Sequence, residues 1–153
     1  MAGKEYALAQ LNLAKFKYPR ESAEMSDFVD NLDRINALAE SSEGFIWRLQ
    51  DEAGDATALR PFGEELLVNL SLWRDVDALH HFVFATQHKD FLRRRPQWFH
   101  KMDTPYVVLW WLPAGTLPDL GDAGERIELL RREGPSPRAF SFRQRFDPPL
   151  TDG

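Results

Sequence analysis

The sequence has 153 residues, of which 43% are hydrophobic and 28% charged, as expected for a single globular domain (1–153) with a sizeable core. Its net charge of −5 argues against a nucleic-acid or anionic-lipid partner, and the lack of cysteine excludes disulfides and thiolate chemistry. The N-terminus lacks an apolar segment of signal-peptide length, and no stretch approaches about 18 apolar residues. We therefore expect a cytoplasmic protein without a membrane partner.

The first predicted element is a strand over residues 6–16, because its side chains alternate with a period of two. One face is uniformly apolar and consists of Ala7, Ala9, Leu11 and Leu13. The other face carries the amides of Gln10 and Asn12, which need partners if they are buried.

A helix is predicted after this strand, and a second strand follows it over residues 45–50. Ser26 can cap the helix, whose apolar stripe consists of Phe28, Leu32, Ile35 and Leu38. Residues 51–55 have the composition of a turn.

The stretch 66–113 predicts strand, helix, helix, strand and contains all four histidines. Residues 66–73 alternate like a strand, and residues 106–112 form the apolar run of a strand buried on both faces. Asp75 can cap the first helix and Thr86 the second. Pro96 is expected to end the second helix or to start a new turn, since proline lacks an amide donor.

The last predicted helix begins at Asp119 or Asp122 and runs through Glu133, where Gly134 and Pro135 end it. Beyond it, residues 135–153 are expected to form an extended arm, because phenylalanines alternate with polar residues over 139–146.

This order of elements predicts an α+β, ferredoxin-like fold with an antiparallel sheet and helices on one face. Several strands are apolar on both faces, so the second face also needs a cover. We expect a second copy of the sheet to provide it, which would make the protein a homodimer with the form of a dimeric α+β barrel.

Four sequence runs carry a family resemblance: NLSLWRDVDALHHFV, QHKDFLRRRPQWF, YVVLWWLPAG and AFSFRQ. Together they resemble DUF3291, a bacterial family of unknown function, over nearly the whole chain. That family is similar to the antibiotic-biosynthesis monooxygenases, whose members are dimeric α+β barrels. The resemblance implies the same fold, but the fold alone does not define a function.

The resemblance makes two activities candidates. Haem-degrading members use an asparagine, a tryptophan and a histidine; Asn12 fits the first position, but the others fall near Phe82 and Leu92. This single match argues against haem. Cofactor-independent members instead take a proton from a phenolic substrate and let the carbanion react with oxygen. We favour this activity on a small apolar or aromatic molecule, with no cofactor; the alternative is a non-catalytic module that binds a small ligand or a partner.

The site is expected between the helices and the strand face that carries Asn12. The resemblance implies that His88 and Asn12 are the catalytic residues. For His88 the chemistry agrees, because a helix start favours the neutral imidazole that a general base needs. The alternative for His88 is a structural role, as a cap or in a bond to a nearby carbonyl. Predicted substrate-binding residues are Trp73, His81, Phe82, Trp98, Phe99 and Trp110.

Two further patterns bear on the site. The histidines lack the regular spacing and the carboxylate companion of a metal site, so no metal is expected. The basic run 93–95 is typical of a solvated helix face, although one arginine could turn inward to bind a carboxylate or phenolate.

Overall fold

The computed structural model describes residues 5–19, 21–49, 66–86 and 88–149. The predicted turn at 51–55 lies outside them. The sheet is built from β1 (Tyr6–Phe16), β2 (Phe45–Arg48), β3 (Leu66–Trp73) and β5 (Val107–Pro113), in the order β2-β3-β1-β5 with antiparallel neighbours. A two-residue strand, β4 (Phe99–His100), pairs with the end of β1 beyond β5. This is the strand order of a ferredoxin-like α+β fold.

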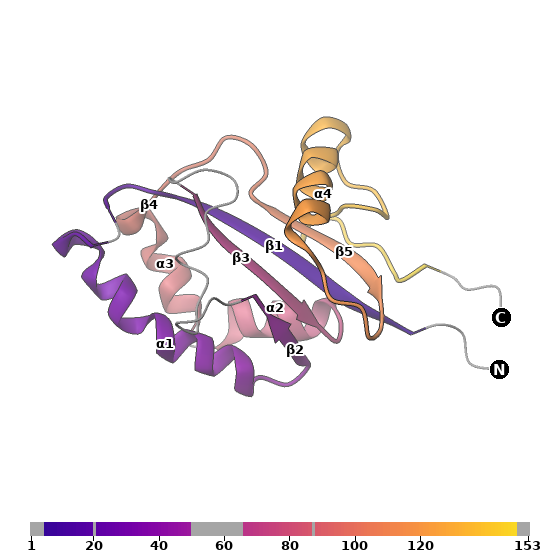
Figure 1. Ribbon diagram of the computed structural model, residues 1–153, viewed down its shortest axis with the longest axis horizontal. Helices are drawn as coiled ribbons and strands as arrows, with labels where there is room; N and C mark the ends of the chain where they lie inside the picture. The colour runs from indigo at the N-terminus through magenta and orange to yellow at the C-terminus, as the bar shows by residue number, and fades with distance from the viewer. Residues whose placement is uncertain (1–4, 20, 50–65, 87, 150–153) are drawn as a thin grey trace.

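Three helices cover one face of this sheet (Figure 1). They are α1 (Ser26–Ser41), which follows a short 3-10 helix η1 (Ala23–Met25), α2 (Val76–Ala85) and α3 (His88–Trp98). Asp75 caps α2 as predicted, because its carboxylate accepts the backbone amide of Ala78 at 2.8 Å. The prediction that Pro96 ends the next helix is wrong: α3 continues two residues further, to Trp98.

The fourth helix, α4 (Leu120–Glu133), packs on the opposite face of the sheet. Its buried stripe of Ala123, Ile127 and Leu130 contacts the odd-numbered residues of β1 from Ala7 to Leu13. The prediction of helices on one face only is therefore wrong, because this stripe finds its apolar surface on the chain's own sheet. The dimeric barrel stays a prediction.

Residues after α4 return to the sheet at the free edge of β5. Phe140 is fully buried and exchanges two backbone hydrogen bonds with Leu109, of 2.8 and 2.9 Å. Further along, the carbonyl of Phe146 accepts the indole N–H of Trp111 at 2.8 Å. This segment covers part of an otherwise unpaired strand edge and adds Phe142 and Phe146 to the core beside α2.

Candidate functional site

The main cavity lies between the even-numbered face of β1 and the three helices α1, α2 and α3. Its volume is about 490 Å³. A smaller hollow of about 120 Å³ opens beside it, towards the end of α3. The residues that line both are Asn12, Ile35, Asn36, Asn69, His88, Leu92 and Arg95.

The floor of the main cavity is a polar ladder across β1 and β3. Gln10 stands opposite Ser71, and Asn12 stands opposite Asn69. The Gln10 amide donates to Asn69 Oδ1 at 3.1 Å and to Ser71 Oγ at 2.9 Å, so this buried amide is satisfied, as a structural role requires. Among the described residues, the side chain of Asn12 has no such partner, and its amide is available to a ligand.

Aromatic side chains form the wall next to this ladder. Trp73 and Phe82 stack with ring centroids 5.2 Å apart and planes 25° from parallel. The Trp73 indole N–H donates to Ser71 Oγ at 2.9 Å, which fixes the ring against the ladder. The wall is therefore apolar, and it meets the polar floor at Ser71.

His88 is held at the first residue of α3 by three local contacts. Its backbone amide donates to Thr86 Oγ1 at 3.2 Å, so Thr86 caps the helix as predicted. Its ring packs on Phe82, with centroids 4.8 Å apart, and Nδ1 lies 3.2 Å from the carbonyl oxygen of Val83.

These contacts determine the chemical state of the imidazole. A carbonyl oxygen can only accept, so Nδ1 carries the proton of the neutral ring and Nε2 keeps its lone pair. Burial lowers the pKa of His88 below 6.5, and the bond to Val83 opposes this only in part. The neutral form was predicted from the helix dipole; in the structure the largest cause of the lowered pKa is burial of the ring.

The structure brings together six of the eight predicted site residues. Asn12, Trp73, Phe82 and His88 line the main cavity, and Trp98 and Phe99 line the smaller hollow. Their predicted roles in binding or catalysis stay predictions.

The other two predicted residues, His81 and Trp110, line neither the main cavity nor the smaller hollow. His81 is exposed on α2, because the helix turns it away from its inward-facing neighbour Phe82. Trp110 is fully buried on the α4 face, because β5 alternates and presents Leu109 and Trp111 to the helix side instead.

Sequence reasoning missed other residues at this site. Asn36 lines both cavities, Tyr106 lines the main one, and Asn69 and Ser71 belong to the ladder. The strand alternation did place Asn69 and Ser71 on one face, but the pairing with Gln10 depends on the register between two distant strands. The inward-turning arginine of the basic run is Arg95.

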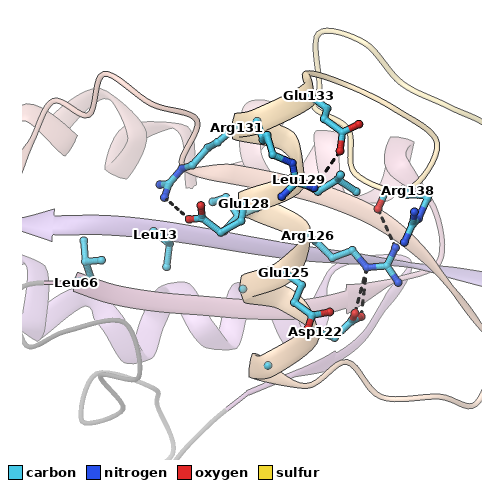
Figure 2. Close-up of a pocket in the computed structure, with 14 residues that line it drawn as sticks. Leu13, Leu66, Asp122, Glu125, Arg126, Glu128, Leu129, Arg131, Glu133 and Arg138 are labelled. Carbon is cyan, nitrogen blue, oxygen red and sulfur yellow. Dashed lines mark hydrogen bonds and ion pairs between the residues drawn. The ribbon is translucent and has the colours of Figure 1, made fainter.

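A larger groove of about 810 Å³ lies on the other face of the sheet, along α4. Figure 2 shows Leu13 and Leu66 on the strands at one side and the charged side chains of α4 at the other. These charges pair with each other, as in the contacts of Arg126 with Asp122 at 3.3 Å. The groove therefore offers a ligand few unsatisfied groups, and the helix-side cavity is the better candidate.

Other kinds of site find little support within the described ranges. Those residues contain no group of three or more His, Asp or Glu side chains placed to hold a metal ion. Over the same ranges, no helix has the length and apolar character needed to cross a membrane.

The fold and the cavity together define the class: an α+β domain with a ferredoxin-like sheet and a cavity of small-molecule size on its helix side. The family model for the domain of unknown function DUF3291 matches residues 7–152, so the chain belongs to this family. No curated protein and no solved structure matches the chain. The similarity to the monooxygenase superfamily stays a prediction.

Proposed function

We propose that this chain is a small-molecule enzyme in which His88 takes a proton from a largely apolar, aromatic substrate held in the main cavity. The observation that carries the proposal is the state of His88 on the cavity wall. Its Nδ1–H donates to the carbonyl oxygen of Val83, and burial favours the neutral ring. The lone pair on Nε2 can therefore accept a proton near neutral pH.

The cavity suits such a substrate in size and in chemistry. Ligand pockets range from about 300 to 1,000 Å³ and combine apolar walls with a few polar groups, and this cavity of about 490 Å³ fits that description. Trp73 and Phe82, stacked on each other, give the cavity an apolar aromatic wall, and the amide of Asn12 can orient a polar substituent.

The reaction we favour is oxygenation without a cofactor. Removal of the phenolic proton gives an anion with carbanion character on the ring, and this carbon reacts directly with O₂. One O₂ is consumed for each quinone formed, and one water is released, so the atoms and electrons balance. The protein's part is to bind the ring, to accept the proton at His88 and to exclude bulk water.

The test uses an oxygen electrode with 1-naphthol and 1,5-dihydroxynaphthalene as probes, on the wild type and two variants. We expect oxygen uptake by the wild type and a loss of about 100-fold or more in kcat for His88→Gln, as removal of a general base produces. The matched control, His81→Gln, changes an exposed histidine on α2 and should leave the rate unchanged.

Binding is followed in parallel by quenching of tryptophan fluorescence, because Trp73 lines the cavity. Phenols that bind without any oxygen uptake above the buffer rate would refute the enzymatic proposal. The chain would then be a non-catalytic module that holds an apolar ligand in the same cavity.

A further inference from the structure

Arg95 differs from the two arginines that precede it in the chain. Arg93 is an exposed side chain 3.6 Å from Asp90, and Arg94 pairs with Asp27 at 2.8 Å. Arg95 is only partly exposed and lines both cavities, and no described carboxylate pairs with it. A guanidinium partly removed from water and without a counter-charge is costly unless something compensates it.

Two aromatic rings packed against the guanidinium and one hydrogen bond hold Arg95 in place. The guanidinium lies 4.4 Å from the ring centroid of Tyr106 and 5.5 Å from that of Phe99. One Nη2–H donates to the carbonyl oxygen of Leu13 at 3.1 Å. These contacts fix the plane of the fork and leave its other N–H groups without an acceptor among the described residues.

The lining of the two cavities also offers Arg95 no described carboxylate as a counter-charge. Although the chain has 24 acidic residues, no described Asp or Glu lines the main cavity or the smaller hollow. The other arginine on the lining, Arg48, already pairs with Glu40 at 2.9 Å. Burial also lowers the pKa of Arg95 from its usual value, the direction expected for a cation that lacks a counter-ion.

We propose that Arg95 is the anion-binding group of this cavity and that the ligand is an aromatic molecule with a carboxylate. A planar carboxylate matches the two parallel N–H groups of a guanidinium fork, and one unpaired arginine balances one negative charge. The ring of the ligand would lie along Trp73 and Phe82. This inference names the substrate class of the site and rests on the proposal that the cavity binds a small aromatic molecule.

The experiment compares two probes of the same shape, 2-naphthoate and its neutral amide 2-naphthamide, by isothermal titration calorimetry near neutral pH. We expect the wild type to bind the carboxylate about 10- to 100-fold more tightly than the amide, the range for charge-assisted hydrogen bonds. Arg95→Gln should abolish this preference while it still binds the amide. Arg95→Lys keeps the charge but not the fork, so it should retain only part of the preference.

Arg93→Gln is the matched control, because it removes the same charge from the same helix but outside both cavities. It should behave as the wild type. Circular dichroism of each variant reports folding, and if Arg95→Gln does not fold, Arg95→Lys alone must show the reduced preference.

The outcomes separate the two proposals. Equal affinity of the wild type for both probes would overturn the anion site and leave the aromatic cavity standing. An undiminished preference in Arg95→Gln and Arg95→Lys would overturn the assignment to Arg95. Failure of both probes to bind would overturn the proposed function and this inference together.

Discussion

Replacement of Ile127 by alanine tests whether α4 belongs to the core of this domain. Ile127 is 2% exposed and packs among the apolar residues of the sheet face that includes Trp110 and Leu11. An isoleucine truncated to alanine in such a position costs about 2–5 kcal/mol. For a chain of this size each kcal/mol lowers the melting temperature by about 2–4 °C, so a loss of about 3 kcal/mol corresponds to about 6–12 °C.

Thermal and urea denaturation, followed by circular dichroism, measure this change. Glu125→Ala is the control, since Glu125 is an exposed residue of the same helix and alanine is a good helix former. The free energies of unfolding of the two variants should therefore differ by about 2–5 kcal/mol. If Ile127→Ala were within about 1 kcal/mol of Glu125→Ala, α4 would not be packed on the sheet in solution, and the account of this face would be refuted.

Three other predictions concern the ladder, His88 and the oligomeric state. Ser71→Ala removes the hydroxyl that accepts from the Gln10 amide and from the Trp73 indole, so it should lower the free energy of unfolding in urea by about 1–3 kcal/mol. The loss should be smaller when the same change is made in a Trp73→Phe background, which already lacks the indole donor. The folded-state pKa of His88 is lowered, so the unfolded chain binds its proton more readily than the folded chain. As pH falls below 6.5, the wild type should therefore lose stability relative to His88→Gln, as measured by urea denaturation at several pH values. Sedimentation at micromolar concentration should give about twice 17.7 kDa if the predicted homodimer forms, and a monomer would remove the barrel hypothesis.

Local patterns in the sequence predicted most elements of the fold. The alternation over 6–16 matches β1 to the residue, and the predicted caps at Asp75, Thr86 and Asp119 all accept backbone amides. The predicted cap at Ser26 is wrong: Ser26 is the first residue of α1, and its hydroxyl donates to the carbonyl of Ala23. These features depend on neighbours in the chain. The side of the sheet that α4 occupies does not, because an apolar stripe on a helix does not specify which sheet face it packs on.

The residues of the candidate site were also only partly predictable from local sequence patterns. Asn12 and His88 could be assigned to one face and to one helix start, and the structure brings both to the main cavity. The inward turn of Arg95 could not be predicted, since three consecutive arginines look alike in sequence and only the packing against Tyr106 and Phe99 separates them. Trp110 was misplaced because adjacent tryptophans on a strand point to opposite faces, and the sequence does not say which one faces the helices.

The alternation of β1 has a consequence for how such a protein can diverge. Residues 8, 10, 12 and 14 face the helix side, whereas residues 7, 9, 11 and 13 face α4. A slip of one residue in the pairing would exchange the two sets, so packing on both faces constrains the register with β3 and β5. With that register kept, substitutions at Gln10 or Asn12 change the floor of the main cavity and leave the α4 face of the strand as it is. If the cavity binds a ligand as proposed, relatives with different ligands should vary at even positions of β1 and keep small or branched apolar residues at odd ones.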